Sequence, residues 1–499
     1  MKGLRALLFC LACLLAQARG LGQSEDLVAK SQRAKEFMAS GKFADAIPLY
    51  RELNRAVPNN AGLTLNLGMA LHMAGEDRKA IPQLEAAVKL DPNLTPAWLF
   101  LGAARLRLGE LPAGANALKV VMRLEPKHRE ACLMLAGALL SLDRLEESVE
   151  QYRKLTELDP QSSQAWYGLG RSYESLAGRA FDELQKTAPE SAYWLALMAE
   201  TRRREQQFSS AFYLYRQALE KMPGLHGLHN AVAEIYRQTG HPDWASAEEE
   251  KEHQFSAPDC RQQRPECAFL AGRYSEVVGI PEGHHTPESY YWRSRAYNEL
   301  ALQSFTRLGE LPASAELHEL KAHIYTSQKK YSEAANEWKT ALELSPGDRQ
   351  IQKQLAINLK FSQDYEQALP LLQDLLRKQP ASAELNYLTG DTLLDLQRAE
   401  DAIPLLMRAV RLDPELLAAH KSLARADLAA GKAVQAIPHL KAALLTDRDG
   451  SLHYQLARAY QVTGQPDLAK NMLAEYQKLQ RSAASANQAA KGEVEITPP

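Results

Sequence analysis

The chain has 499 residues, of which 45% are hydrophobic and 24% are charged, and its formal net charge at pH 7 is −2. These proportions are those of a folded, soluble protein, so they argue against global disorder. The near-neutral charge also argues against a protein that holds nucleic acid or another polyanion by bulk electrostatics, because such proteins are markedly basic.

The first 18 residues have the pattern of a secretory signal peptide. Lys2 and Arg5 precede an unbroken apolar run over residues 6–16, and the sequence Ala-Gln-Ala at 16–18 supplies the small residues of a cleavage site. The run is too short to span a bilayer, since a transmembrane helix needs roughly 20 apolar residues. We therefore expect a mature chain without a transmembrane segment, exported to the periplasm or secreted; an uncleaved N-terminal anchor is the alternative.

A pattern with a period of 34 residues follows this segment. Residues 27–60 and 61–94 both place a small residue at the eighth position, a bulky residue at the eleventh, alanine at the twentieth and proline at the thirty-second. The same spacing continues to residue 162, returns in 192–225 and runs again from 315 to 483. In the first two copies the small residues, alanines and prolines are Ala34 and Gly68, Ala46 and Ala80, and Pro58 and Pro92.

Each copy of the pattern predicts two antiparallel helices. Apolar residues recur at i, i+3, i+4 and i+7 within each half, which is the periodicity of a helix with one buried face. Glycine near the fifteenth position predicts the turn between the halves, because glycine adopts positive φ without steric cost. Small residues at positions 8 and 20 allow the two helices to approach closely, and proline near position 32 ends the second helix.

This pattern resembles the tetratricopeptide repeat (TPR) family over roughly residues 27–483. The resemblance implies an all-α fold, a right-handed superhelical α-solenoid of helix-turn-helix repeats whose first helices line a concave groove for peptides or partner proteins. We accordingly expect four TPR repeats in 27–162, variant and degenerate repeats in 163–259, an irregular junction in 260–290, a variant repeat followed by five TPR repeats in 291–483, and a disordered tail in 484–499.

Two shortened repeats suggest that the array consists of two related lobes. Residues 163–191 lack the turn into a second helix, and residues 286–314 resemble them. The stretch RSYESLAGRAFDELQ, residues 171–185, aligns without gaps with RAYNELALQSFTRLG, residues 295–309. Because a regular repeat follows each copy, we infer that an ancestral pair was duplicated, which gives an N-terminal and a C-terminal lobe joined through 260–290.

The junction contains Cys260 and Cys267, for which the sequence favours a disulfide. In a continuous helix two residues seven apart are separated by about 10 Å of rise, whereas a disulfide needs Cα atoms roughly 4.4–6.8 Å apart. A loop must therefore intervene, and Pro265 favours one because the residue before proline is pushed away from helical angles. Export would place the pair in a compartment where disulfides persist.

Other roles for the two cysteines remain open. A metal site would draw on His284 and His285, but neither C-x-x-C nor H-x₃₋₅-H spacing is present. A reactive thiolate is conceivable for Cys267 if it lies near a helix N-terminus, and two unpaired thiols are a further alternative. Cys132 falls at the fourth position of a first helix, where a buried, unpaired cysteine is the ordinary expectation.

No catalytic motif accompanies the repeats. The sequence contains no Gly-rich phosphate-binding loop, no G-x-S-x-G and no H-E-x-x-H. Glutamates and histidines are plentiful, but a repeat array distributes them over solvated faces. We therefore expect a protein that is not an enzyme and needs no cofactor.

The resemblance to the TPR family also implies candidate groove residues, because positions 2, 5, 9 and 12 of the first helices face the concave side in that family. They suggest an apolar groove in the early repeats and a basic one in the late repeats, which would suit a partner with a hydrophobic and an acidic segment. The alternative is that the apolar residues pack against neighbouring helices and the basic ones are solvated. The candidates are Leu65, Met69, Leu99, Leu106, Tyr167, Arg171, Arg203, Arg237, Lys353, Lys360, Tyr387, Lys421 and Arg425.

The functional expectation is an exported scaffold that binds protein or peptide ligands and no nucleic acid. An alternative of a different kind is an envelope assembly or export factor that recognises extended peptides or polysaccharide machinery, as part of an envelope-associated complex.

Overall fold

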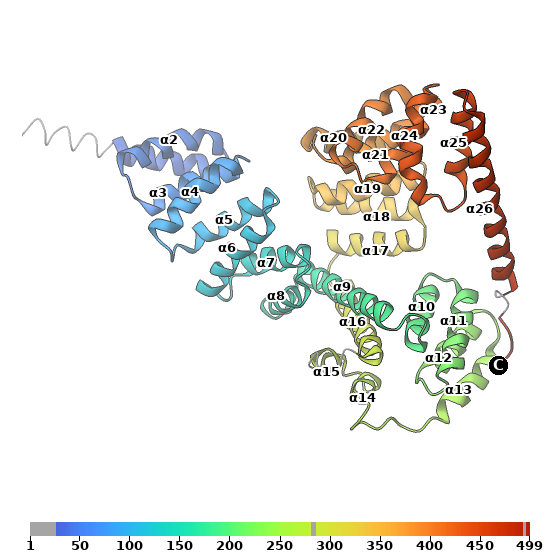
Figure 1. The fold of residues 1–499 in the computed structure, drawn as a ribbon. Helices are drawn as coiled ribbons and strands as arrows, with labels where there is room; N and C mark the ends of the chain where they lie inside the picture. Colours follow the sequence, from blue (N-terminus) through green and yellow to red (C-terminus); the bar gives the residue numbers. More distant parts are fainter. Residues whose placement is uncertain (1–25, 281–285, 493–495) are drawn as a thin grey trace, which may run out of the picture. The chain divides into compact units, whose positions relative to one another are not determined.

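The computed structural model describes residues 26–280, 286–492 and 496–499. The expected signal peptide, and His284 and His285, lie outside these residues. Within them the chain is helical and contains no strand (Figure 1). No helix in this part of the chain is both long enough and apolar enough to cross a membrane.

The helices are arranged as consecutive antiparallel pairs, as the 34-residue pattern predicts (Figure 1). The pairs before residue 260 include α3 (Ala61–Met73) with α4 (Asp77–Leu90), α5 (Thr95–Arg107) with α6 (Leu111–Leu124), α7 (Arg129–Ser141) with α8 (Leu145–Leu158), α10 (Ala192–Arg204) with α11 (Phe208–Lys221), and α12 (Leu228–Gln238) with α13 (Pro242–His253); α2 (Phe43–Ala56) precedes them.

The later pairs follow the same rule from residue 315 onward. They are α17 (Ala315–Ser327) with α18 (Tyr331–Leu344), α19 (Arg349–Phe361) with α20 (Tyr365–Lys378), α21 (Ala383–Asp395) with α22 (Ala399–Leu412), α23 (Leu417–Ala429) with α24 (Ala433–Ala443), and α25 (Ser451–Val462) with α26 (Pro466–Gly492).

Two long helices replace a pair where the sequence lacks the internal turn. They are α9 (Ser163–Thr187) and α16 (Pro287–Gly309). The chain divides into two compact units, the first comprising Met1–Ala177 and Tyr297–Arg307, and the second Gly178–Ala296 and Leu308–Pro499. Both long helices therefore contribute residues to both units, and the boundary falls within helices and not at the expected junction in 260–290.

The close approach of paired helices rests on the small residues of the pattern. A Cβ atom added to Gly68 would lie 2.7 Å from the side chain of Leu84, and one added to Gly102 would lie 2.7 Å from Leu118. Each leucine is fully buried and comes from the second helix of the same repeat. Glycine at position 8 thus leaves the volume that the leucine at position 24 fills.

The turn between paired helices requires a left-handed residue, and glycine fills this position only in some repeats. Gly75 and Gly109 have φ of 82° and 81°. In other repeats a residue with a side chain adopts the same conformation, with φ between 58° and 66°; these residues are Asp143, Gln206, Lys329, Gln363 and Gln397. The packing of the two helices therefore outweighs the steric cost of about 1–2 kcal/mol for a left-handed residue that has a Cβ atom.

A proline inside the second helix is a feature that the sequence reading missed. It occupies position 22 of the repeat, and the prolines concerned are Pro48, Pro82, Pro370, Pro404 and Pro438. Proline has no N–H to offer the carbonyl four residues earlier. That carbonyl belongs in each case to an exposed residue near the helix start, where water can satisfy it.

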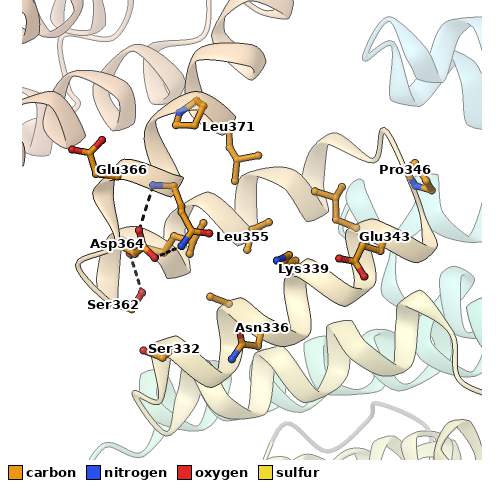
Figure 2. Close-up of a pocket in the computed structure, with 15 residues that line it drawn as sticks. Ser332, Asn336, Lys339, Glu343, Pro346, Leu355, Ser362, Asp364, Glu366 and Leu371 are labelled. Carbon is orange, nitrogen blue, oxygen red and sulfur yellow. Dashed lines mark hydrogen bonds between the residues drawn. The ribbon is translucent and has the colours of Figure 1, made fainter.

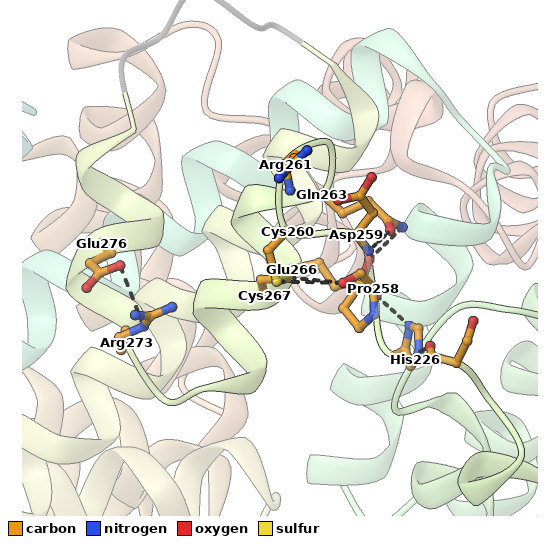
Figure 3. The surroundings of a disulfide bond; sticks show 11 residues. His226, Pro258, Asp259, Cys260, Arg261, Gln263, Glu266, Cys267, Arg273 and Glu276 are labelled. Atoms are coloured by element: carbon orange, nitrogen blue, oxygen red, sulfur yellow. Dashed lines mark hydrogen bonds and ion pairs between the residues drawn. A yellow bond between two sulfur atoms is a disulfide. The ribbon is translucent and has the colours of Figure 1, made fainter.

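The segment expected to be an irregular junction contains two short helices, α14 (Arg264–Leu270) and α15 (Tyr274–Gly279). A disulfide joins Cys260, which lies in a turn, to Cys267 in α14, and their Cα atoms are 5.6 Å apart (Figure 3). Beside it, the ring of His226 lies with Nδ1 2.8 Å from a carboxylate oxygen of Glu266. The intervening loop that the sequence required is thus present.

The last residues differ from the expected disordered tail. Helix α26 continues to Gly492. The segment Ile496–Pro499 contacts α12 of the same unit, because the hydroxyl of Tyr236 donates a hydrogen bond of 2.6 Å to the carbonyl of Thr497.

The contacts of two glycines in first helices predict different effects on stability for their substitution by alanine. Gly68→Ala should lower the free energy of unfolding by about 1–3 kcal/mol, because the added methyl group overlaps Leu84. Gly137→Ala is the matched control in α7, since its Cβ would make an ordinary contact at 3.6 Å with the hydroxyl of Tyr152. It should leave stability unchanged or raise it by up to about 1 kcal/mol through helix propensity. Thermal unfolding followed by circular dichroism would decide; equal losses in both variants would contradict this account.

The disulfide predicts a specific pattern of thiol reactivity. Digestion without reduction should yield a linked pair of peptides that contain Cys260 and Cys267. Cys132 should be alkylated only after unfolding, because it is fully buried and burial raises the pKa of its thiol to about 11. Replacing both linked cysteines with serine should lower the free energy of unfolding by about 2–3 kcal/mol. Rapid alkylation of Cys260 and Cys267 in native, exported protein would contradict the pairing.

Candidate functional site

The apolar candidates of the early repeats mainly pack within the helix array of the first unit. Leu65 and Leu99 are only 7% and 8% exposed and belong to hydrophobic clusters. Leu106 fills the space beside Gly114 of the following helix, where an added Cβ atom would lie 2.6 Å from it. Met69 is half-buried against the same cluster as Leu65. These leucines hold neighbouring helices together, so they offer little surface to a partner.

A buried polar cluster lies among the same helices. The ring of His72 lies with Nδ1 2.6 Å from a carboxylate oxygen of Asp77, and Arg107 of the next repeat donates to Asp77 at 2.6 Å. Burial lowers the pKa of His72. Burial also acts to raise the pKa of Asp77, but hydrogen bonds from Arg107 and His72 outweigh it and the pKa of Asp77 lies below its usual value. The cluster is a satisfied network that links two repeats.

The candidates on α9 belong to the first unit. Arg171 forms an ion pair of 2.8 Å with Glu174 on its own helix. The ring of Tyr167 faces that of Phe305, with centroids 6.4 Å apart. Both side chains therefore have partners within the unit.

In the second unit Arg203 lies in a small, charge-balanced pocket of about 250 Å³. Arg295 donates to the hydroxyl of Tyr291 at 3.1 Å and lies 3.9 Å from the carboxylate of Glu200. Its guanidinium also stacks 4.5 Å from the ring centroid of Phe269. The pocket lining is Ala196, Glu200, Arg203, Tyr215, Gly227, Leu228, Asn230, Ala231, Glu234, Tyr291 and Arg295. Two arginines face two glutamates, so the pocket has no strong preference for either sign of ligand.

Arg237, the remaining candidate of this region, is neutralised by its neighbours. It forms an ion pair of 2.9 Å with Glu234 and a second with Glu249. It is exposed, but its charge is already compensated.

The late repeats do bring several candidates together, although not as a basic groove. Lys360 lies 2.7 Å from Asp391 and 3.1 Å from Asp395, and Arg425 lies 3.4 Å and 3.2 Å from the same two carboxylates. Burial acts to lower the pKa of Lys360, but Asp391 and Asp395 outweigh it and raise that pKa above its usual value. Tyr387 is half-buried beside this network. Lys360 and Arg425 therefore form ion pairs that connect three consecutive repeats, and their charges are already compensated.

The two other lysines differ from each other. Lys353 forms an ion pair of 3.0 Å with Glu384 of the next repeat. Lys421 is exposed, and no ion pair is found for it in the described part of the chain. The expected basic surface therefore reduces to this one lysine among the four late cations that the sequence had suggested, because carboxylates of neighbouring repeats neutralise the rest.

A cavity with an apolar floor lies elsewhere, between the second helices of two adjacent repeats. We call it the α18–α20 groove; its volume is about 830 Å³ (Figure 2). Leu355 and Leu359 of α19 form its base, and the half-buried Leu342 of α18 and Leu371 of α20 face it from the two sides. Its lining is Ser332, Ala335, Asn336, Lys339, Leu342, Glu343, Pro346, Leu355, Leu359, Ser362, Asp364, Glu366, Gln367, Pro370 and Leu371.

The rim of the α18–α20 groove is acidic. Glu343 and Glu366 are exposed, Asp364 caps α20 by accepting a hydrogen bond from the backbone of Gln367, and Lys339 is the one cation in the lining. The sequence reading missed this groove because it considered only first-helix positions. Leu342 and Leu371, at repeat positions 28 and 23, are apolar residues on second helices that could have indicated the groove. The distance between the two helices, which the sequence does not give, decides whether a groove forms between them.

The described residues contain no group of three or more histidine, cysteine, aspartate or glutamate side chains that could hold a metal ion. The arrangement that the described residues show is an apolar floor with an acidic rim, together with networks of paired charges.

Comparison with protein families gives the same repeat over much of the chain. Three family models, each described as a tetratricopeptide repeat, match residues 31–95 and 354–416, residues 105–171, and residues 315–348. Comparison with curated protein sequences gave no significant match.

Several solved structures are similar to parts of the chain. The MamA protein is 23% identical and covers 40% of this chain and 92% of its own length, with a TM-score of 0.29. A tetratricopeptide repeat protein from Parabacteroides merdae is 15% identical, with coverages of 67% and 98% and a TM-score of 0.32. The first TPR domain of Spaghetti (RPAP3), bound to the HSP90 peptide SRMEEVD, is 26% identical, with coverages of 23% and 93% and a TM-score of 0.23.

At these TM-scores the structural similarities carry no argument of their own. The assignment rests on the family models, which match in both halves of the chain, and on the helix pairs with their glycine and alanine contacts. The chain is a member of the tetratricopeptide repeat family.

Proposed function

We propose that this chain is an exported, non-enzymatic scaffold that binds a partner protein in the α18–α20 groove. The partner would contribute a segment that combines aliphatic and basic side chains. The observation that carries the proposal is the open apolar floor under an acidic rim. Membership of a repeat family whose members commonly bind proteins supports it.

The floor of the α18–α20 groove supplies a reason to bind. Leu342 and Leu371 keep part of their apolar surface in water, and covering such surface is favourable by roughly 25 cal/mol per Å². Leu355 and Leu359 beneath them are already held by the core and provide a preformed base. A preformed site costs little ordering on the protein side, which favours affinity.

The charges on the rim of the α18–α20 groove indicate the charge of the partner segment. Glu343, Glu366 and Asp364 outnumber Lys339 around the opening, so a basic segment would approach more readily than an acidic one. On α19, the first helix of one of these repeats, Lys353 is compensated by Glu384, and Lys360 is compensated by Asp391 and Asp395. This reverses the earlier expectation of an acidic partner for the late repeats.

Export is the second part of the proposal. The charged start, apolar run and Ala-Gln-Ala sequence of residues 1–18 support it. The disulfide between Cys260 and Cys267 is consistent with it, because disulfides persist mainly in oxidising compartments.

The groove can be tested with a peptide library. The immobilised full chain, panned against random 12-residue peptides, should enrich sequences with aliphatic residues and a net positive charge. Leu371→Asp should weaken a selected peptide at least about tenfold, because it places a charge in the floor. Glu343→Lys combined with Glu366→Lys should weaken it about three- to tenfold through the rim charge. Fluorescence anisotropy gives the affinities.

Lys421→Glu is the matched control for this experiment, since Lys421 is exposed on a first helix and lies outside the groove. It should leave the affinity unchanged, and circular dichroism should show all variants folded. Selected peptides that bind Leu371→Asp as tightly as the unaltered chain would refute the groove as the site.

Export has its own test. When the full chain is produced in a bacterial host, N-terminal sequencing of the protein from the periplasm or medium should start at Arg19, directly after Ala18. Replacing Ala16 and Ala18 with aspartate should block cleavage. Folded protein found in the cytosol with residues 1–18 intact would contradict this part of the proposal and leave the groove proposal standing.

A further inference from the structure

The segment Ile496–Pro499 contacts a distant part of the second unit. The hydroxyl of Tyr236, on α12, donates a hydrogen bond of 2.6 Å to the carbonyl of Thr497, across 261 positions of sequence. Ile496 packs against the hydrophobic cluster to which Tyr236 belongs. The repeat pattern does not require this contact, because the pairing of α25 with α26 is complete without it.

Tyr236 depends on this segment for its hydroxyl partner. Its side chain is 0% exposed, and a buried hydroxyl without a hydrogen bond is unfavourable. Within the described residues, Thr497 supplies the one acceptor found for this hydroxyl. Burial, followed by the charge of Glu248, raises the pKa of Tyr236 to about 12, so the hydroxyl keeps its proton at neutral pH and can donate it.

The side chains around Tyr236 are aromatic. The ring of Phe212, on α11, lies 5.5 Å from that of Tyr236 between centroids, and the ring of Trp244, on α13, lies 5.6 Å away in an edge-to-face arrangement. His241 stacks on Trp244 at 4.0 Å. Such a cluster offers an apolar surface to the side chain of Ile496 and a hydroxyl donor to the carbonyl of the next residue, Thr497.

The segment has the matching chemistry. Pro498 and Pro499 are themselves exposed, and they stiffen the segment because they fix their own φ angles and lack N–H groups. Thr497 precedes a proline and is therefore biased toward an extended conformation. The carbonyl of Thr497 needs a hydrogen-bond donor from outside the segment, because the two prolines that follow have no N–H group. A stiff segment also loses little conformational entropy when it binds.

We propose that the aromatic cluster of Phe212, Tyr236 and Trp244 is a binding site for an extended peptide segment that presents an aliphatic side chain followed by a backbone carbonyl held before a proline, and that Ile496–Pro499 of this chain is its intramolecular occupant. This site is separate from the α18–α20 groove and does not depend on it. A partner that presents a similar segment must displace Ile496–Pro499, so the chain regulates access to the site itself.

The test uses a synthetic peptide of residues 490–499 with a fluorescein at its N-terminus. A chain that ends at residue 495 should bind this peptide at least about tenfold more tightly than the full chain, in which the site is occupied. The full-length variant Ile496→Asp should behave like the shortened chain, because it frees the site without changing the length. The peptide with the same Ile→Asp change should not bind.

A second comparison isolates the hydrogen bond. In the shortened chain Tyr236→Phe should weaken the peptide roughly three- to tenfold, the range for one lost hydrogen bond. Tyr460→Phe is the matched control: Tyr460 occupies the same repeat position in α25, is also buried and lies in another hydrophobic cluster. It should leave the affinity unchanged.

Three results would overturn the inference. They are equal peptide affinity for the full and shortened chains, failure of the folded, shortened chain to bind at all, and no effect of Tyr236→Phe. Sedimentation velocity separates the two sources of the segment. If the full chain forms dimers, and the dimers dissociate when residues 496–499 are removed, the segment binds to a second copy of the chain. That result would overturn the intramolecular assignment.

Discussion

The close contact between the two helices of each repeat is the constraint on which the rest of the structure depends. Gly68 and Gly102 leave space that Leu84 and Leu118 fill, and the alanines at position 20, such as Ala80, are fully buried in the same interface. The turn must then be short enough to keep this contact. Asp143 and Gln363 adopt a left-handed conformation for that reason, although a side chain makes it unfavourable.

The same contact explains which surfaces remain for function. When paired helices approach closely, the apolar side chains of the first helices pack against neighbouring repeats. Residues such as Leu65 and Leu99 are therefore buried in the core. Between the second helices α18 and α20, by contrast, an opening with a leucine floor remains (Figure 2). The proposed binding surface therefore lies between second helices.

Periodicity was sufficient to predict the helix pairs, because burial of one face every 3.6 residues is a local property. The missing turns in 163–191 and 286–314 likewise predicted irregular units, which proved to be the continuous helices α9 and α16. Charge was harder to predict. Lys360 and Arg425 suggested a basic groove, but Asp391 and Asp395, at positions 9 and 13 of the repeat between them, neutralise both. Asp391 occupies one of the expected groove positions, so the signal was present in the sequence. The contact of Tyr236 with Thr497 joins residues 261 positions apart, and no local pattern encodes it.

The division of α9 and α16 between two units has a consequence for synthesis on the ribosome. Helix α9 needs Tyr297–Arg307 to complete its packing in the first unit, where Tyr173 stacks on Tyr297 and Phe305 fills the space beside Gly170. Translation at about 5–20 residues per second delivers that segment on the order of ten seconds after Ala177. During this interval Gly170 and Tyr173 of α9 lack the partners that Phe305 and Tyr297 supply, although Gly168 and Ser172 already pack against Tyr152 and Ser148 of α8. Nascent chains of this length therefore expose an apolar surface that is open to a chaperone or to another nascent chain.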